Sequence, residues 1–480
     1  MANRLFKSNN SRSRWPFHKV LIANRGEIAV RIIRTCRVLG LATVAVYSTT
    51  DAKALHVKLA DEAVCIGPGS AEKSYLNISA LIGAALVTGA DAVHPGFGFL
   101  SESVAFSRAC QDNDLTFIGP SPETIALLGD KEAARLTMRR AGLPLVKGSQ
   151  EPLHDLATAL AQAEEVGYPV MLKAAAGGGG KGMRIIRNAE EMEAKFAVAQ
   201  DEARASFNDD QMYLEQYLAH PRHIEVQVIG DQYGNALALG ERDCTIQARH
   251  QKVIEEAPAA VLPAPVREAM LAQSEQAAAQ LKYEGLGTIE FLYNEDGSYY
   301  FMEMNTRIQV EHTVTEMVTG IDLVKAQLVV AAGEALPFAQ ADIKAQGVAI
   351  ECRINAEDPK RGFFPSTGKV TYLYLPVGNL GMRIDTALYP GVTVSPYYDS
   401  MVAKVIAHGN DRQEAISRLR RLLNEMVITG ITTNQNFHLA ILNDPVFNEA
   451  TFTTNYLEQE FLPRWKGELA SETLQGEKHP

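Results

Sequence analysis

The chain has 480 residues, of which 46 % are hydrophobic and 21 % charged, and it carries a formal net charge of −11 at pH 7. A chain of this length folds into roughly two to four domains, and its acidic balance disfavours nucleic acid as a partner. The five cysteines form no C-x-x-C pair, and no apolar run approaches the ~20 residues that span a bilayer. We therefore expect a cytoplasmic protein without disulfides, thiolate metal sites or a membrane partner.

The first part of the chain alternates between strand and helix patterns. Residues 1–18 carry arginine and lysine but no acid and no apolar core of a secretory signal, so we predict a disordered extension there. A helix over about 27–39 has Asn24 as its expected N-cap and Gly40 after its last turn. Further helices are expected at 77–88 and 101–113, and strands at 19–23, 41–48, 63–67, 91–95 and 115–119. This alternation predicts an α/β domain with a parallel sheet at 19–119, although no G-x-G-x-x-G motif indicates a dinucleotide site.

The rest of the chain is divided by turn and helix signals. We expect a helical linker at 120–145, a small α/β module at 146–217, a C-terminal domain at 218–465 and a disordered tail at 466–480. The small module is expected to contain helices at 153–166 and 189–205 and strands at 168–175, 183–187 and 212–218. The C-terminal domain should open with strands at 222–229 and 236–239 and close with helices near 411–427 and 433–443.

The segment Tyr299–His312, YYFMEMNTRIQVEH, has a polar or charged residue at every second position. A period of two is typical of a strand. Its polar face would carry Glu303, Asn305, Arg307, Gln309 and Glu311 in succession. Carboxylates, amides and a guanidinium suit a metal and anion site along one strand, and the alternative is an amphipathic edge strand with a solvated face.

The sequence AAGGGGKGM at 175–183 joins two expected strands. Adjacent glycines lack Cβ atoms, so their N–H groups can approach phosphate oxygens. The segment does not match the Walker A pattern. Its position in the small α/β module, with Lys173 before it and Lys181 within it, favours a lid over a phosphate-containing ligand. A simple hairpin turn is the alternative.

Two expected strands at 288–293 and 298–305 flank a turn at 294–297, which predicts a hairpin. If Tyr293 pairs with Ser298, Glu290 and Glu303 are diagonal neighbours on one face, roughly 7–8 Å apart at the backbone. Two carboxylates at this spacing suit Mg²⁺ bound together with nucleotide phosphates. A surface cluster of salt bridges is the alternative.

The segment ERDCTIQARHQKVIEEAP at 241–258 is rich in cationic side chains and ends in two glutamates. These groups could hold anions and protons, but a solvated loop of mixed charge explains the composition equally well. Upstream, His223, Glu225 and Gln227 fall on one face of an expected strand, where a lone histidine is more often structural.

Together the motifs resemble those of the biotin carboxylase subunit of bacterial acetyl-CoA carboxylase, a member of the ATP-grasp family. The resemblance covers nearly the whole chain from about Lys19. It rests on ANRGEIAVRIIRTCRVLG, HPGFGFLSE, GYPVMLKAAAGGGGKGMR, HPRHIEVQV, ERDCTIQARHQKVIEEAP, FMEMNTRIQVEH, ECRINAED and PYYDSM. It implies a multidomain α/β and α+β protein with the ATP-grasp fold, formed by a Rossmann-like N-terminal domain, a mobile B lid domain and a C-terminal domain.

The resemblance also implies a role for each matching residue. At ATP it implies Lys131, Lys173, Gly178, Gly179, Gly180, Glu215, Gln216, Tyr217, Leu218, His223, Gln247, His250 and Glu290. At two expected sites for Mg²⁺ or Mn²⁺ it implies Glu290, Glu303 and Asn305, and at bicarbonate Lys252, Arg307, Gln309, Val310 and Glu311. At biotin it implies Phe97 and Arg353, and as catalytic residues Glu311, Arg353, Arg307 and Lys252.

The implied reaction is the MgATP-dependent carboxylation of carrier-bound biotin by bicarbonate through carboxyphosphate. This is the first half-reaction of acetyl-CoA carboxylase in fatty acid synthesis. Glu311 would remove the proton of bicarbonate, and Arg353 would stabilise the oxyanion of biotin. The expected partners are a biotin carboxyl carrier protein, carboxyltransferase subunits and a second copy of the chain, with Arg31 and Arg34 near that interface.

Three positions differ from the common family pattern. Phe97 replaces a frequent tyrosine and so lacks a hydroxyl near biotin, whereas Lys181 replaces a frequent arginine and Gln216 a frequent lysine. None of these changes removes a group that the chemistry requires.

Three other functions remain possible at this point. A different ATP-grasp ligase would share Glu290 and Glu303 but would not need Arg353 or the 307–311 motif. A nucleotide-binding regulatory protein would have lost ATPase activity. A multidomain pyruvate or propionyl-CoA carboxylase could contain this chain as its N-terminal part, but the absence of a biotinylated Met-Lys-Met segment favours a separate carrier.

Overall fold

The computed structural model describes residues 15–149, 151–174, 183–207, 210–249 and 251–465. The chain forms two compact units. The larger consists of Met1–Leu143, Arg222–Phe291 and Met302–Pro480, and the smaller of Pro144–Pro221 and Leu292–Phe301. In the part of the chain that the structure describes, no helix is both long and apolar enough to cross a membrane.

The larger unit begins with a five-stranded parallel sheet of order β3-β2-β1-β4-β5, as the alternating sequence pattern predicts. Its strands are β1 (Lys19–Ile22), β2 (Ala42–Ser48), β3 (Glu62–Gly67), β4 (Ala92–His94) and β5 (Thr116–Phe117). The helices and 3-10 turns of this region are α1 (Gly26–Leu39), η3 (Thr49–Asp51), α2 (Leu55–Leu59), η4 (Ala71–Lys73), α3 (Ile78–Thr88) and α4 (Val104–Asp112). Alternate residues of β1 enter two different cores, so α1 packs on one face of the sheet and α3 and α4 on the other.

The start of α1 differs from the prediction. Arg25, not Asn24, occupies the N-cap position, and Gly40 ends the helix as expected with a φ of 73°. The Asn24 side chain instead donates two hydrogen bonds of 2.8 Å, to the carbonyls of Pro95 and Phe97. Asn24 therefore fixes the loop that carries Phe97 rather than capping the helix.

The second sheet of the larger unit has eight strands in the order β13-β12-β9-β10-β11-β14-β21-β19. They are β9 (Arg222–Gly230), β10 (Ala236–Ala248), β11 (Gln251–Ala257), β12 (Gly285–Tyr293), β13 (Tyr299–Asn305), β14 (Val348–Asn355), β19 (Met382–Thr386) and β21 (Met401–Gly409). β10 is much longer than the predicted strand at 236–239. The segment 241–258 is therefore two buried antiparallel strands, and the alternative of a solvated loop is wrong.

The prediction of one strand through 299–312 is also wrong beyond Asn305. The Thr306 amide donates to Glu102 Oε1 at 3.0 Å instead of to a neighbouring strand, and Glu311 lies at the N-cap of the next helix. Gln309 and Glu311 are nonetheless buried, so the alternative of a solvated face is wrong as well.

The hairpin between β12 and β13 closes with a different pairing from the one predicted. The Asn294 amide donates to the Ser298 carbonyl at 2.8 Å, and Gly297 donates back to Asn294 at 3.0 Å. Gly297 has a φ of 86°, which glycine adopts without strain and which closes the turn. Asn294, rather than Tyr293, is therefore the partner of Ser298.

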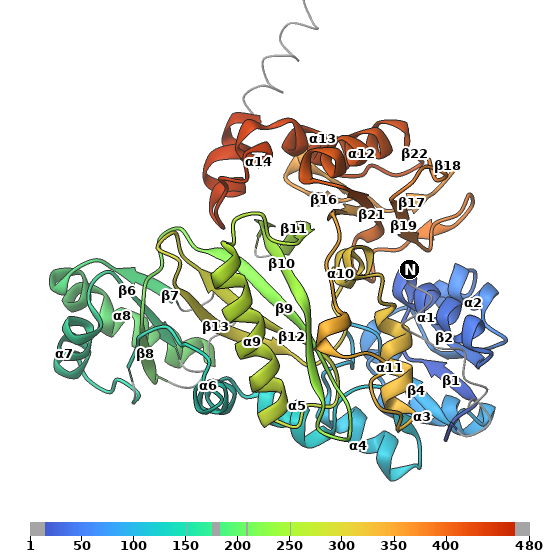
Figure 1. The fold of residues 1–480 in the computed structure, drawn as a ribbon, viewed down its shortest axis with the longest axis horizontal. Helices are drawn as coiled ribbons and strands as arrows, with labels where there is room; N and C mark the ends of the chain where they lie inside the picture. The colour runs from blue at the N-terminus through green and yellow to red at the C-terminus, as the bar shows by residue number, and fades with distance from the viewer. Residues whose placement is uncertain (1–14, 150, 175–182, 208–209, 250, 466–480) are drawn as a thin grey trace, which may run out of the picture. The chain divides into compact units, whose positions relative to one another are not determined.

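Helices and short strands complete the larger unit. The helices are α5 (Pro122–Gly129), α6 (Lys131–Arg140), α9 (Ala264–Gln280), α10 (His312–Thr319), α11 (Leu323–Ala331), η5 (Gln340–Asp342), η6 (Pro359–Arg361), α12 (Arg412–Glu425), α13 (Gln435–Asn443), α14 (Pro445–Asn448) and the π-helix η7 (Tyr456–Phe461). The short strands are β15 (Glu357–Asp358), β16 (Phe364–Pro365), β17 (Gly368–Lys369), β18 (Tyr372–Tyr374), β20 (Thr393–Val394) and β22 (Val427–Thr429). In Figure 1, α12 and α13 lie together beside β21, and their apolar faces share one core with β14 and β21.

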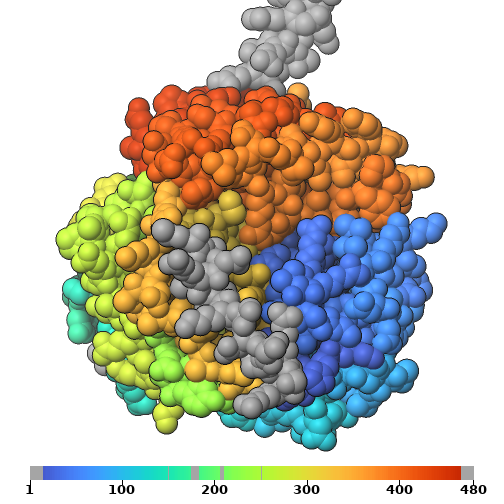
Figure 2. Space-filling view, turned by 45° about the vertical axis from the view of Figure 1, so that its right-hand side comes forward, coloured from blue at the N-terminus to red at the C-terminus, as the bar shows by residue number. Residues whose placement is uncertain are grey.

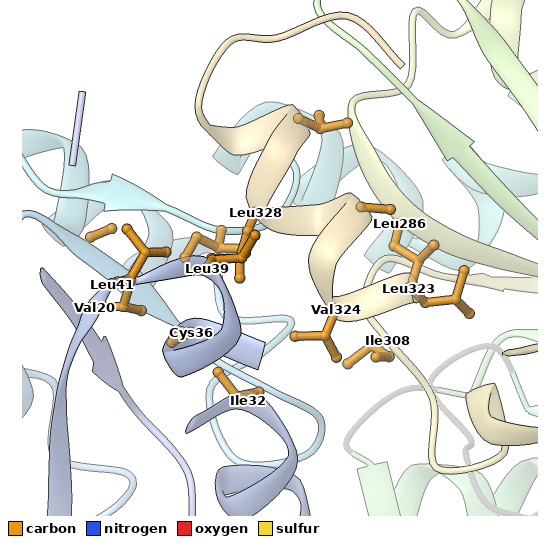
Figure 3. Packing of buried hydrophobic residues seen from close by; sticks show 14 of the residues in the cluster. Val20, Ile32, Cys36, Leu39, Leu41, Leu286, Ile308, Leu323, Val324 and Leu328 are labelled. Carbon is orange, nitrogen blue, oxygen red and sulfur yellow. The ribbon is translucent and has the colours of Figure 1, made fainter. Parts of the chain in front are cut away.

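A continuous apolar core joins the N-terminal sheet to later segments of the chain. Figure 3 shows Ile32 and Cys36 of α1 facing Val324 and Leu328 of α11, and all four are buried in one cluster. Burying a side chain of the Ile or Leu type stabilises the fold by about 1.5–3 kcal/mol. Because α11 follows the 306–311 segment and α10, this core holds the predicted bicarbonate segment against the N-terminal sheet.

The C-terminal part also contacts the N-terminal part through polar groups, and Figure 2 shows the two (orange and blue) side by side on one face. Arg25 forms a bidentate pair with Asp51 at 2.6 and 2.9 Å and stacks over the ring of Tyr398 at 4.1 Å. The Tyr398 hydroxyl lies 2.6 Å from Ser48 Oγ and donates to the Gly69 carbonyl at 2.7 Å. The PYYDSM motif is thus fixed to the first sheet.

The smaller unit contains a three-stranded antiparallel sheet of order β7-β6-β8. Its elements are α7 (Leu156–Val166), β6 (Val170–Ala174), β7 (Met183–Ile186), α8 (Ala189–Phe207) and β8 (Met212–Gln216). Leu172 and Leu214 of the sheet pack with Phe196 of α8 in a core of its own. The glycine-rich segment 175–182, including Gly178, Gly179, Gly180 and Lys181, lies outside the described residues.

Candidate active site

The candidate site is centred on the buried ammonium group of Lys252 on β11. Its Nζ atom lies 2.5 Å from Glu225 Oε2, 2.6 Å from Glu311 Oε1 and 3.0 Å from Glu290 Oε1. Burial disfavours the charged lysine, but the three carboxylates outweigh burial and raise its pKa well above the ordinary value. Lys252 therefore remains protonated and holds three acids from three separate segments together.

A register shift brings Lys252 to this position. β10 and β11 are antiparallel, and their pairing changes between Ile246↔Ile254 and Gln247↔Lys252. A bulge of this kind changes the direction in which the neighbouring side chains point. The irregular pairing beside Lys252 therefore helps to set the direction of its side chain.

Arg242 of β10 connects the carboxylates to the 306–311 segment. Its side chain is fully buried and donates to Glu225 Oε1 at 2.5 Å, Gln227 Oε1 at 2.7 Å and Gln309 Oε1 at 2.6 Å. Gln309 in turn donates from Nε2 to Glu290 Oε1 at 2.7 Å. Because the Arg242 guanidinium accepts no hydrogen bond, it fixes which end of the Gln309 amide points toward Glu290.

Arg307 is held by two neighbours at the edge of this network. Its Nε donates to Glu102 Oε2 at 2.8 Å, and its Nη2 donates to Asn305 Oδ1 at 2.8 Å. The side chain keeps about one fifth of its surface exposed. Arg307 is thus orientated by its partners while one side of it is open to a ligand.

Glu311 lies between two cations. Its Oε1 faces Lys252, and its Oε2 accepts from Arg353 Nη2 at 3.0 Å. Arg353 is itself fixed by Glu255 Oε1, which accepts from its Nε at 2.5 Å. Burial raises the pKa of Glu311, but the positive charges of Lys252 and Arg353 outweigh burial and bring it below the ordinary value. Glu311 is therefore ionised at neutral pH.

His223 of β9 faces the same acids from the other side. Its Nε2 lies 3.0 Å from Glu290 Oε2 and 3.7 Å from Glu225 Oε2. Burial disfavours the charged ring, but the Glu290 carboxylate outweighs burial and raises the pKa of His223 to about 9. The histidine is therefore a cation at neutral pH, and not a neutral structural group.

The donor chemistry of Glu290 and Glu303 fits a divalent cation. Burial raises the pKa of Glu303, and the negative charge of Glu290 raises it further. A cation bound by both carboxylates would relieve this repulsion, and oxygen donors of this type suit Mg²⁺. Asn305 donates from Nδ2 to Glu290 at 2.9 Å, while its oxygen accepts from Arg307. The Asn305 oxygen has a second lone pair that could bind a metal ion while the first accepts from Arg307.

Lys404 connects the predicted bicarbonate and biotin residues. Its buried Nζ donates to the Val310 carbonyl at 2.9 Å, lies 3.1 Å from Glu27 Oε1 and lies 6.0 Å from the centre of the Phe97 ring. On the sheet, Lys404 is the direct partner of Arg353. The structure thus brings Phe97 to the Arg353 side of the site through a lysine that the sequence motifs did not identify.

The remaining residues predicted at ATP are more dispersed. Lys131 is exposed at the start of α6, and Gln247 donates from Nε2 to the Cys244 carbonyl at 2.9 Å. In the smaller unit, Lys173 pairs with Glu215, and Glu215 and Gln216 end β8 before the half-buried Tyr217 and Leu218. His250 lies outside the described residues. The nucleotide roles of these residues stay predictions.

Several described residues whose side chains contact the predicted site residues were missing from the predicted set, among them Glu102, Glu225, Arg242, Glu255 and Lys404. Glu225 carried a signal, because it alternates with His223 and Gln227 on β9. Arg242 and Glu255 were visible only as members of a charged segment. Glu102 and Lys404 come from distant parts of the chain, and their contacts depend on how those parts pack.

Family models cover most of the chain. Residues 16–125 match the N-terminal domain of biotin carboxylase, residues 130–339 the ATP-binding domain of the carbamoyl-phosphate synthase L chain, and residues 351–459 the C-terminal domain of biotin carboxylase. Biotin carboxylase 1 of Bacillus subtilis is 52 % identical over 441 residues, which are 92 % of this chain and 98 % of the relative. The chain belongs to the biotin carboxylase family. Biotin carboxylase of Haemophilus influenzae is similarly related, with 53 % identity over 443 residues, 92 % of this chain and 98 % of the relative.

Solved biotin carboxylase structures have the same fold. The biotin carboxylase domain dimer of Hydrogenobacter thermophilus 2-oxoglutarate carboxylase, in complex with MgADP, ADP and bicarbonate, matches with a TM-score of 0.85 and 48 % identity over 92 % of this chain and 97 % of that one. The Campylobacter jejuni enzyme in complex with β,γ-ATP matches with a TM-score of 0.86 and 46 % identity over 92 % of this chain and 99 % of that one. The predictions of an ATP-grasp fold and of an ATP-dependent biotin carboxylase that uses MgATP are confirmed.

Proposed function

We propose that this biotin carboxylase carboxylates biotin on a separate carrier protein, with bicarbonate activated between Lys252, Arg307, Gln309 and Glu311. The observation that carries the proposal is the position of Glu311 between two cations. Lys252 and Arg353 lie at 2.6 and 3.0 Å from its two oxygens. One carboxylate thus borders both the side predicted to bind bicarbonate and the side predicted to bind biotin.

Bicarbonate is a poor nucleophile until it loses its proton, and Glu311 is the proposed base. In the ligand-free site the cations keep the pKa of Glu311 too low for efficient proton removal. An anion that binds Lys252 would share the charge of this lysine with Glu311 and would thereby raise the pKa of Glu311. We propose that bicarbonate itself activates its base in this way.

The deprotonated bicarbonate oxygen would attack the γ-phosphorus of ATP, so that ADP leaves and carboxyphosphate forms. Glu290 and Glu303 are the proposed ligands of the divalent metal. When bound, the metal would neutralise negative charge on the nucleotide phosphates. His223, protonated at neutral pH, would add positive charge beside Glu290.

Carboxyphosphate would divide into CO₂ and phosphate, and the phosphate would take the proton from the ureido nitrogen of biotin. Arg353 is the proposed donor to the resulting biotin oxyanion, because its guanidinium is held in place by Glu255 and Glu311. Phe97 would pack against biotin without the hydroxyl that a tyrosine would supply.

We also propose the partners and the cellular context. The carrier would be a biotin carboxyl carrier protein and the acceptor would be carboxylated by carboxyltransferase subunits, as in acetyl-CoA carboxylase. The dimer of the Hydrogenobacter thermophilus domain supports a homodimer here. Arg31 forms ion pairs with Glu316 and Asp322 of its own chain, so the exposed Arg34 is the better interface candidate.

The free state of all five cysteines supports a cytoplasmic location.

The decisive experiment is ADP release from MgATP, with bicarbonate and free biotin each omitted in turn. We expect bicarbonate to be required for ADP release and biotin to accelerate it. A different ATP-grasp ligase would release ADP with an amine or another carboxylate instead, and a regulatory protein would release none. Either result would overturn the proposal.

A further inference from the structure

Two glutamates lie directly opposite each other in the sheet behind Arg353. Glu255 of β11 pairs with Glu351 of β14 in the antiparallel register, and neither side chain has any exposed surface. Neither residue is among those proposed to contact a substrate. Like charges in directly opposite positions destabilise a sheet, so two ionised carboxylates in this position would be strongly unfavourable.

Each glutamate has one oxygen that accepts a hydrogen bond and one that does not. Glu255 Oε1 accepts from Arg353 Nε at 2.5 Å, and Glu351 Oε2 accepts from the hydroxyl of Thr313 on α10. The other oxygens, Glu255 Oε2 and Glu351 Oε1, are buried and accept no hydrogen bond from the described residues. The Cβ atoms of directly opposite residues are about 4.5–5.5 Å apart. A single proton shared by the two free oxygens would satisfy both.

The charged groups around the pair are consistent with one bound proton. The charges of Arg353, Lys252 and Glu311 act on Glu255. The charges of Lys404, Arg353 and Glu255 act on Glu351. Burial raises the pKa of Glu255, and the charge of Glu311 raises it further, whereas Arg353 and Lys252 lower it. Burial likewise raises the pKa of Glu351, and the charge of Glu255 raises it further, whereas Lys404 and Arg353 lower it. The cations stabilise one negative charge on the pair but do not suffice for two.

We propose that Glu255 and Glu351 share one proton and act as a titratable support that positions Arg353. With the proton bound, the pair presents one negative charge to the Arg353 guanidinium. When the proton is lost to solvent at alkaline pH, the pair presents two. The added negative charge weakens the ability of Arg353 to stabilise a biotin oxyanion. The inference rests on the proposed function in its assignment of Arg353 to biotin.

The proposal predicts different pH profiles for two reactions of the same enzyme. Biotin-dependent turnover needs Arg353 to stabilise an oxyanion, so its rate should fall as the pair loses its proton. Bicarbonate-dependent ADP release without biotin does not need that step, so its pH profile should not contain the same fall. A merely structural role of the pair would change both reactions together.

The test uses Glu351→Gln, in which a neutral amide replaces the protonated acid and cannot lose a proton at this pH. The matched control is Glu256→Gln. Glu256 is the next residue on β11 and is equally buried, but it pairs with Arg412 at 2.8 Å instead of Arg353. We expect the alkaline fall of biotin-dependent turnover to move up by about one pH unit or more in Glu351→Gln and to stay unchanged in Glu256→Gln. An unchanged fall in Glu351→Gln, or an equal shift in both variants, would overturn the proposal.

A second measurement does not depend on activity. Infrared spectroscopy of the wild-type full chain should show a protonated carboxyl band that persists at a pH where exposed acids are ionised and disappears at alkaline pH. This titration should be missing from Glu351→Gln and present in Glu256→Gln. If it is equally present in Glu351→Gln, the band belongs to another carboxyl and the pair does not share a proton. If wild-type enzyme releases no ADP with bicarbonate, the proposed function fails, while the infrared result still decides whether the pair exists.

Discussion

Two buried networks of charged side chains differ in how their charges are matched. Around Glu316 of α10, each acid meets a guanidinium group: Arg383 lies 2.6 Å from Glu316 and forms a bidentate pair with Asp385 at 2.9 and 2.7 Å, and Arg31 lies 2.8 Å from Glu316. In the other network, the single ammonium group of Lys252 forms ion pairs with Glu225, Glu290 and Glu311. The first network is complete without a ligand. In the second, the three acids also meet cations in Arg242, His223 and Arg353. Burial and the charge of Glu290 nevertheless raise the pKa of Glu303, so negative charge at this carboxyl is unmatched until a metal ion binds.

The difference indicates which buried charges serve the fold and which serve the reaction. Ion pairs with bidentate geometry stabilise a particular packing arrangement, and removal of one partner leaves an isolated buried charge. Glu290 and Glu303 repel each other in the free protein, and a divalent cation bound by both would relieve this repulsion. Substitutions in the first network should therefore change stability, and substitutions in the second should change turnover.

The largest effect is expected for Glu311→Gln. The amide keeps the size of the side chain but cannot remove a proton, so bicarbonate-dependent ADP release should fall by about 10²–10⁴-fold. ATP binding, measured by calorimetry, should remain close to wild type. Near-normal turnover in this variant would show that another group is the base.

A smaller effect, confined to one substrate, is expected for Arg353→Ala. Loss of the oxyanion donor should lower biotin-dependent turnover by about 10²–10³-fold, whereas ATP affinity should change little. The measurement is kcat/KM for free biotin beside the Kd for ATP. An equal loss of both would count against a role at biotin.

The matched network is tested by Arg383→Met. Because the change leaves Glu316 and Asp385 without their guanidinium partner, it should destabilise the larger unit by about 3–5 kcal/mol. Thermal unfolding monitored by fluorescence measures the loss. At a temperature well below the transition, kcat per folded molecule should equal that of wild type; a large fall in kcat would erase the distinction between the two networks.

The unmatched network should show a pH dependence of stability. The pKa of His223 is raised to about 9, above the roughly 6.5 of an unfolded histidine. The stabilisation is therefore complete below about pH 6.5 and is lost as the pH rises through about 9. The Tm of the ligand-free protein should fall over this interval, and His223→Gln should remove that part of the fall. Saturating Mg²⁺ should shift it to lower pH, because a metal on Glu290 cancels the charge that raises the pKa; no effect of Mg²⁺ would argue against Glu290 as a ligand.

The smallest effect is expected for Phe97→Tyr. A new hydrogen bond to biotin contributes about 0.5–1.5 kcal/mol, so the KM for free biotin should fall by no more than about tenfold. Bicarbonate-dependent ADP release without biotin should not change and serves as the control. A rise in KM would mean that the hydroxyl is not accommodated beside Lys404.

Much of the fold could be predicted from the sequence because its signals are local. The alternation up to residue 119, the glycine after α1 and the two closing helices each depend on neighbouring residues, and the structure has all of them. For β13 two sequence signals disagreed: the hairpin predicted a strand at 298–305, which is where β13 ends, whereas the period of two predicted a strand through 312. The period of two continues through Glu311, but Thr306 donates to Glu102, a residue about two hundred positions away.

In the candidate site, too, the features with a local sequence signal could be predicted and those that depend on distant residues could not. The motif at 303–311 contains the acids and amides that meet Lys252 and Arg242, so the residue types could be read directly. The hairpin register that was used to bring Glu290 and Glu303 together was off by one residue, although the charge of Glu290 does act on Glu303. Lys404 had no local signal, and Glu255 was visible only as a member of a charged segment. Their roles depend on strands β21 and β11 lying on either side of β14.

The ion pair between Lys404 and Glu27 also has a consequence for the order of folding. It joins residues from opposite ends of the chain, and the same lysine holds the Val310 carbonyl. During synthesis the first sheet can form early, since domains fold as their residues emerge. The loop that carries Glu311 can be fixed only after β21 has left the ribosome and closed this long-range contact. Catalytic competence is therefore acquired only after Lys404 has been synthesised, so a shorter nascent chain carries a folded N-terminal sheet without an assembled site for bicarbonate.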